Sequence, residues 1–122
     1  MTRRDDRVSL QQMLDHVEEA MSLAKGRTQS DLESDRVFFL AMLKLVEIVG
    51  EAAMRVSETM QASHPEIPWR QVIGTRNRLV HGYDAVDCNI LWDIVTADFP
   101  ALASQLRAVL QGNSPKTNGA KP

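Results

Sequence analysis

A short polar run between Gly74 and Asp84 holds the side chains of this sequence that could act on a phosphodiester. It contains two guanidinium groups, an amide, an imidazole, a phenol and a carboxylate, which belong to Arg76, Arg78, Asn77, His81, Tyr83 and Asp84. A guanidinium presents a fixed fork of donors that matches the oxygens of a phosphate. An imidazole, with an ordinary pKa of about 6.5, can accept and release a proton near neutral pH. The run therefore predicts acid–base chemistry on an anionic substrate.

The spacing of these residues restricts how they can meet. On a helix with about 3.6 residues per turn, Asn77 and His81 are neighbours on one face. Arg76 and His81 are five residues apart and would be separated by about 140° on a regular helix. They can converge if the helix ends or bends at His81, and Gly82 offers such an end. Otherwise the long Arg76 side chain must reach around the helix, or a second chain must complete the site.

Each of these residues also has a purely structural interpretation. Arg76 and Arg78 could be solvated or paired with surface acids, and His81 could be a cation at a helix C-terminus. Tyr83 could be a packing residue with a solvated hydroxyl. Singly these interpretations are favoured, but the clustering in a chain with three histidines and one tyrosine favours a functional site.

The overall charge of the chain argues against a protein that binds long duplexes but permits an enzyme that acts on a single phosphodiester. A formal net charge of −2 and a sequence pI of about 5.9 provide no general basic field. Tight binding of long duplexes requires many phosphate contacts and is disfavoured. An enzyme that acts on one exposed phosphodiester needs only a local cluster of cations.

Metal-ligating and thiol chemistry have little support in the sequence. Cys88 is the single cysteine, so no intramolecular disulfide and no thiolate metal site can form. His16 and His64 show no metal-ligand spacing, and no glycine-rich phosphate loop is present. Glu47 and Glu51 form an acidic pair, and Glu47 could line a cleft or neutralise an arginine. We expect no metal and no cofactor.

The rest of the sequence predicts an all-α protein, an up-and-down antiparallel bundle of four to five helices. Its 122 residues have room for one domain. We expect a helical domain over residues 1–111 and a disordered tail over residues 112–122, which can bury little apolar surface. No apolar run approaches the ~20 residues of a membrane span, and a cytoplasmic location is the simplest expectation.

Hydrophobic spacing and stop signals place four helical segments. The first runs from Val8 to Lys25, ends at Gly26 and buries Leu10, Met13, Leu14, Val17, Ala20, Met21 and Ala24. The second starts with a capping box at Ser30–Glu33 and continues to about Ala62. It is apolar on two sides, which indicates either a central helix or half of a dimer interface.

The third and fourth segments flank the polar run. The third starts at Pro68, which suits a first helical turn, and ends near His81 and Gly82. The fourth begins after Asp87, a good N-cap, and reaches Leu110. Pro100 is expected to kink this segment or divide it in two.

The segment Arg76–Tyr83 resembles the Arg-x4-His-x-Tyr signature of the HepT-like ribonuclease toxins, within a HEPN superfamily marked by Arg-x4–6-His. Asn77, directly after the arginine, is also typical of the superfamily. The resemblance extends over roughly Val8 to Leu110 through three further segments: Ile48–Ala53, which is similar to a Gly-Glu-Ala helix, Pro68–Gly74, and Leu91–Val95 with Phe99–Leu102. The ordered set is far more specific than the short motif alone.

The resemblance implies a HEPN-like fold and a metal-independent endoribonuclease of a type VII-like toxin–antitoxin system. It implies a homodimer whose motifs meet in one cleft, and RNA as the substrate, with tRNA and mRNA as candidates. Arg76, Asn77 and His81 would be catalytic, and Tyr83 and Arg78 would bind substrate. The implied partner is a minimal nucleotidyltransferase antitoxin, which would transfer AMP to Tyr83.

Two other functions remain open at this point. The chain could be a catalytically silent HEPN helper that binds a nucleotidyltransferase and presents its substrate, which its mild acidity favours. It could also be a structural dimerisation bundle. The intact set of Arg76, Asn77, His81 and Tyr83 favours the ribonuclease, because neither alternative needs that chemistry.

Overall fold

The computed structural model describes residues 3–80 and 85–112, and within these ranges all regular secondary structure is helical apart from one isolated bridge. This confirms the all-α prediction. The predicted tail lies outside the described residues from position 113 onward. No helix within the described ranges is long and apolar enough to cross a membrane.

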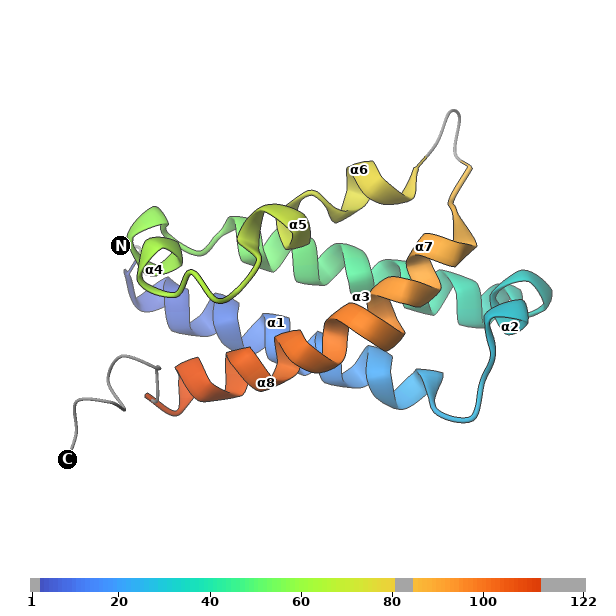
Figure 1. Cartoon of the computed structure of the whole chain (residues 1–122), viewed down its shortest axis with the longest axis horizontal. Coiled ribbons are helices and arrows are strands. Elements are labelled where there is room, and N and C mark those ends of the chain that lie inside the picture. Colours follow the sequence, from blue (N-terminus) through green and yellow to red (C-terminus); the bar gives the residue numbers. More distant parts are fainter. Residues whose placement is uncertain (1–2, 81–84, 113–122) are drawn as a thin grey trace.

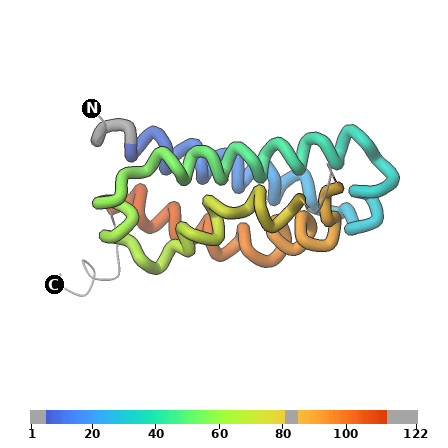
Figure 2. The backbone as a smooth tube through the Cα atoms, turned by 90° about the horizontal axis from the view of Figure 1, so that it is seen from above, coloured from blue at the N-terminus to red at the C-terminus, as the bar shows by residue number. Residues whose placement is uncertain are grey.

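Four helical rods alternate in direction along the bundle (Figure 1). Helix α1 (Arg3–Ala24) and α3 (Arg36–Met54) form two of them. Short helices α5 (Trp69–Ile73) and α6 (Thr75–Leu79) make the third. The fourth consists of α7 (Cys88–Asp93), the short π-helix η1 (Ile94–Asp98) and α8 (Phe99–Leu110). Each rod contacts the next, and the fourth contacts α1, so the bundle is closed (Figure 2).

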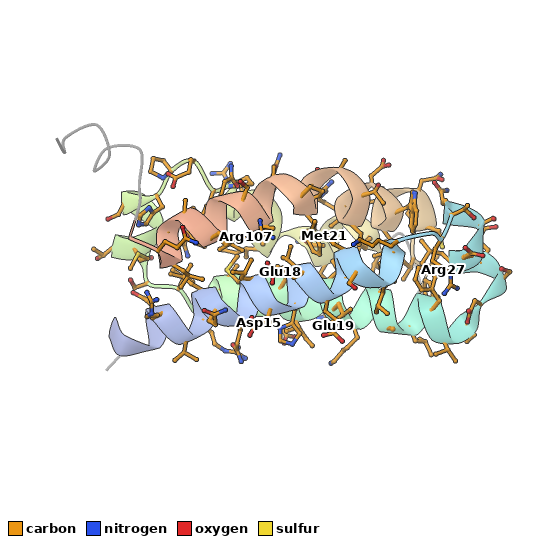
Figure 3. All side chains as sticks on the ribbon, turned by 90° about the horizontal axis from the view of Figure 1, so that it is seen from below. Asp15, Glu18, Glu19, Met21, Arg27 and Arg107 are labelled. Atoms are coloured by element: carbon orange, nitrogen blue, oxygen red, sulfur yellow. The ribbon has the colours of Figure 1, made fainter. Side chains whose placement is uncertain are left out.

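The first rod matches its prediction closely. The predicted inward side chains of α1 are buried except Met21, which is half-buried. Gly26 ends the helix with φ of +74°, a backbone conformation that favours glycine. Between α1 and α8, Glu18 accepts hydrogen bonds from Arg107 at 2.8 and 3.0 Å (Figure 3).

The prediction of one continuous helix from Ser30 to Ala62 was wrong. Three helices occupy this range: α2 (Gln29–Ser34), α3, and α4 (Glu58–Ser63). The capping box lies two residues earlier than predicted, because Thr28 is the N-cap and its N–H donates to Asp31 at 2.8 Å.

Polar side chains that compete with helical hydrogen bonds produce both breaks in this range. Asp35 adopts an extended conformation after α2 and caps α3 by accepting from the N–H of Phe38. Ser57 caps α4, and its N–H and hydroxyl both donate to the buried carboxylate of Asp6, at 2.8 and 2.7 Å. The second break depends on a contact between residues 51 apart in sequence, which local spacing cannot reveal.

The predicted third helix is divided at Gly74 and ends earlier than expected. The helix begins at Trp69 with Pro68 as its N-cap, one residue later than predicted, and Gly74 separates α5 from α6. The end predicted near His81 was wrong, because α6 stops at Leu79 and Val80 is extended. Val80 forms a bridge with Val86, so the chain turns away from the helix two residues before the motif histidine.

The fourth segment is divided near Pro100, as predicted. Asp87 is the N-cap of α7 and accepts from the N–H groups of Asn89 and Ile90, which confirms the predicted start. Pro100 has no N–H to offer the carbonyl of Thr96, and its ring would crowd that carbonyl in a regular helix. The helix widens instead, and Phe99 N–H bonds the carbonyl of Ile94, five residues earlier.

Helix α3 is apolar on more than one side, as its sequence predicted. Val49 and Ala53 are both buried, and α3 packs against α1, α2, α5 and α6. Its outer side still exposes large apolar groups: Val37 is 77% exposed, Leu40 46% and Met54 63%.

We predict that Leu79→Ala destabilises the protein by about 2–5 kcal/mol, because Leu79 is completely buried and its removal leaves a cavity. The neighbouring change Val80→Ala is the control. Val80 is 39% exposed, so its loss should change the free energy of unfolding by roughly 0.5 kcal/mol or less. Urea denaturation measures both, and equal effects would show that Leu79 does not anchor α6.

Candidate active site on helix α6

Helix α6 is too short to be stable alone, and contacts with its surroundings hold it in place. Leu79 is buried at its C-terminal end. The buried hydroxyl of Thr75 donates to the carbonyls of Val72 and Gln71, at 2.7 and 3.2 Å, which joins α6 to α5. Close packing of α5 on α3 requires Gly50, since a Cβ there would lie 3.1 Å from the carbonyl oxygen of Val72.

Arg76 borders a hollow of about 260 Å³ between α3 and the α5–α6 rod. Its side chain is exposed, and no carboxylate among the described residues forms an ion pair with it. Glu47 and Glu51 line the same hollow from α3. Glu47 thus borders a hollow together with Arg76, and its role in a catalytic cleft stays a prediction. Arg76 is a cation available to an anionic ligand beside two carboxylates.

Arg78 lies on the other side of α6. Its guanidinium pairs with Asp98 of η1 at 3.5 Å, and both residues border a second hollow of about 240 Å³ between α5–α6 and the η1–α8 rod. The pair is largely exposed and contributes little to stability. The two motif arginines thus point into different hollows. Asn77, between them in sequence, is exposed on α6.

The ends of the segment that carries His81 and Tyr83 are held together. Val80 and Val86 form an antiparallel bridge, and the N–H of Asp87 donates to the carbonyl of Leu79 at 2.9 Å. His81 and Tyr83 themselves lie outside the described residues. The helix ends at Leu79, two residues before the position at which the sequence required an end or bend, and the convergence of Arg76 with His81 stays a prediction.

Metal-ligating groups are not clustered in residues 3–80 and 85–112, where no set of three His, Cys, Asp or Glu side chains could hold an ion. The two described histidines make local contacts. His16 Nδ1 lies 2.7 Å from the carbonyl of Gln12, whereas His64 Nδ1 lies 3.4 Å from a carboxylate oxygen of Glu66 without a hydrogen bond to it.

Sequence reasoning missed two residues beside the motif. Asp98 pairs with Arg78 across 20 residues of sequence, and no local pattern marks it. Glu51 was noted as one of an acidic pair, but its position in the Arg76 hollow follows from how α5 packs at Gly50.

Comparison with known proteins assigns the family. Residues 13–109 match the family described as HepT-like, ribonuclease HepT-like. A Thermococcus cleftensis protein named "Probable ribonuclease HepT" is 34% identical over 73% of this chain and 84% of its own length. A protein of Caldanaerobacter subterraneus subsp. tengcongensis, named as a "Putative RNase", is 30% identical over 84% of this chain and 91% of its own. No solved structure matches the chain significantly.

The chain therefore belongs to the HepT-like ribonuclease family, in agreement with the resemblance found in its sequence. A Methanocaldococcus jannaschii protein with the same "Putative RNase" designation is 27% identical over 89% of this chain and the whole of its own length. The family match spans α6 and the helices that position it.

We predict that the thiol of Cys88 reacts more slowly with iodoacetamide than a free thiol does at the same pH. Burial, and then the charges of Glu33 and Asp87, raise the pKa of Cys88, so less thiolate is present at any given pH. Glu33→Gln removes one of these charges, should lower the pKa and should speed the reaction. Mass spectrometry across a pH series measures the rates, and an unchanged rate profile in Glu33→Gln would contradict this assignment.

Proposed function

We propose that the chain is a metal-independent endoribonuclease and the toxin of a type VII-like toxin–antitoxin pair. The observation that carries the proposal is the exposed Arg76, which forms no ion pair with any described residue and lies on a helix that stops two residues before His81. Membership of the HepT-like family supports the reaction class. RNA, with tRNA or mRNA as candidates, would be cut in the cytoplasm.

The proposed reaction uses the RNA's own 2′-hydroxyl as the nucleophile. Its oxygen attacks the adjacent phosphorus, and the bond from phosphorus to the 5′-oxygen breaks. His81 takes the proton from the 2′-hydroxyl or gives one to the leaving oxygen. Arg76 stabilises the charge that grows on the phosphorane-like transition state. The products are a 2′,3′-cyclic phosphate and a 5′-hydroxyl, and DNA is inert because it lacks the nucleophile.

The remaining motif residues would bind or orient the substrate. Asn77 orients His81 or holds RNA, and Tyr83 donates a hydrogen bond to the phosphate or the 2′-hydroxyl. Arg78 contacts a flanking phosphate after exchanging its ion pair with Asp98. That exchange is inexpensive, because the pair is 3.5 Å long and solvent-exposed.

A homodimer and an antitoxin complete the proposal. Val37 near the start of α3 and Met54 near its end are exposed apolar side chains on the side of the helix that also carries Lys44, Glu47 and Glu51. Exposed apolar groups interspersed with charges suit a second copy of the chain, which would bring the two motifs into one cleft. A minimal nucleotidyltransferase would neutralise the site by transferring AMP to Tyr83.

One observation favours the alternative function, a silent helper that binds a nucleotidyltransferase. Glu47 and Glu51 line the hollow that Arg76 borders, and carboxylates there repel an RNA phosphate. The helper and the ribonuclease differ in one respect that is easily measured, since only the ribonuclease needs His81.

We predict that expression of the wild-type chain alone arrests growth of a bacterial host, and that His81→Ala abolishes the arrest. Total RNA from the arrested cells should carry new 2′,3′-cyclic phosphate ends that are missing in the variant. His16→Ala, which changes a histidine on α1, is the matched control and should behave as wild type. Equal, harmless growth of all three strains, with His81→Ala still binding a nucleotidyltransferase, would favour the helper.

A further inference from the structure

A third hollow lies at the other end of α3, beside the Val80–Val86 bridge. It has a volume of about 580 Å³ and is bordered by the end of α2, the first two turns of α3, and Val86 and Cys88 before and at the start of α7. Its apolar wall consists of Leu32, Phe39, Leu40, Leu43 and Val86, and its polar groups are Glu33, Ser34, Arg36 and the Cys88 thiol.

The wall of this hollow combines an aromatic ring with an arginine. Phe39 is partly buried against the core, and Arg36 lies over its ring with the guanidinium carbon 5.5 Å from the ring centre, so a base that stacks on this face takes the place of the guanidinium. Arg36 is exposed and forms no ion pair within the described parts of the chain. Aromatic rings stack on nucleobases of any sequence, and a neighbouring arginine binds the phosphate.

The position of the hollow relative to the motif strengthens this interpretation. Val86, on its wall, forms the bridge with Val80 that closes the ends of the segment carrying His81 and Tyr83. Leu43 borders this hollow and Glu47 borders the Arg76 hollow. These residues are one helical turn apart, a rise of about 6 Å. A single strand lying along α3 can therefore reach both hollows.

We propose that the Phe39–Arg36 hollow binds one nucleobase of the RNA, adjacent to the scissile phosphate, with Arg36 on that nucleotide's phosphate. This inference rests on the proposed ribonuclease function and adds a subsite to it. Glu33 and Ser34 supply acceptors at the rim, and an exocyclic amino group offers them two donor hydrogens whereas uracil offers the single N3–H, so a base with such an amino group is preferred over uracil. The subsite would give the enzyme sequence preference that the motif alone cannot supply.

The binding test uses fluorescein-labelled 2′-O-methyl homopolymers of A, C, G or U, which the 2′-hydroxyl mechanism cannot cleave. We expect Phe39→Leu to weaken binding roughly tenfold, the scale of one lost base–aromatic stack, and Phe39→Tyr to retain it. Arg36→Gln should weaken binding and lower the slope of log affinity against log salt by roughly 0.7, as for one lost phosphate contact. Arg55→Gln, an exposed arginine just after α3, is the charge-matched control and should bind as wild type.

Cys88 provides a second readout that does not depend on folding of any variant. It is the single cysteine of the chain and lies on the wall of the hollow, so iodoacetamide reports on this place alone. Bound adenine or cytosine 2′-O-methyl oligomer should slow labelling of the wild-type thiol. Unchanged labelling at saturating oligomer would overturn the subsite.

The outcomes separate this inference from the proposed function. Cleavage of RNA by the wild type without protection of Cys88 would refute the subsite and leave the ribonuclease intact. Protection and the expected Phe39 and Arg36 effects without any cleavage would support the subsite and refute the nuclease. A loss of dimer on gel filtration in Phe39→Leu, with oligomer affinity unchanged, would show that a second copy covers the hollow and would overturn the proposal.

Discussion

The packing of α6 against its neighbours is the constraint on which the candidate site depends. A five-residue helix cannot persist alone in water, so its orientation comes from a buried Leu79, the Thr75 hydroxyl and the close approach of α5 to Gly50. Together these contacts leave Arg76 on the α3 side of the rod and Arg78 on the α8 side. The motif is therefore placed by the core of the bundle, although its reactive groups lie at the surface.

The charges around α6 suit a small nuclease that acts locally. The whole chain is slightly acidic, and the proposed RNA contacts rest on single arginines rather than on a basic face. Arg76 and Arg36 are unpaired within residues 3–80 and 85–112, whereas Arg78 is paired with Asp98. Two unpaired arginines spread along α3 and α6 favour a short single strand over a duplex, since duplex binding depends on many phosphate contacts.

Most of the fold, but fewer of its boundaries, could be predicted from the sequence. The hydrophobic period located all four rods, and strong local signals such as Gly26, Asp87 and Pro100 acted where expected. The wrong boundaries arise where distant contacts decide: the chain does not continue α3 into α4, because Ser57, the N-cap of α4, is held by Asp6. The arginines of the site are evident in the motif. Their separation into two hollows could not be predicted from the sequence, because it depends on packing between rods.

The central claim is that Arg76 stabilises a metal-independent cleavage of RNA. Its most direct test incubates the purified chain with single-stranded RNA and excess chelator, beside Arg76→Ala and, as a control, Arg70→Ala, an exposed arginine on α5. The account predicts chelator-resistant cleavage with 2′,3′-cyclic phosphate ends, reduced about 10²–10³-fold in Arg76→Ala and unchanged in Arg70→Ala. Loss of cleavage with chelator, 5′-phosphate products, or full activity in Arg76→Ala would contradict it.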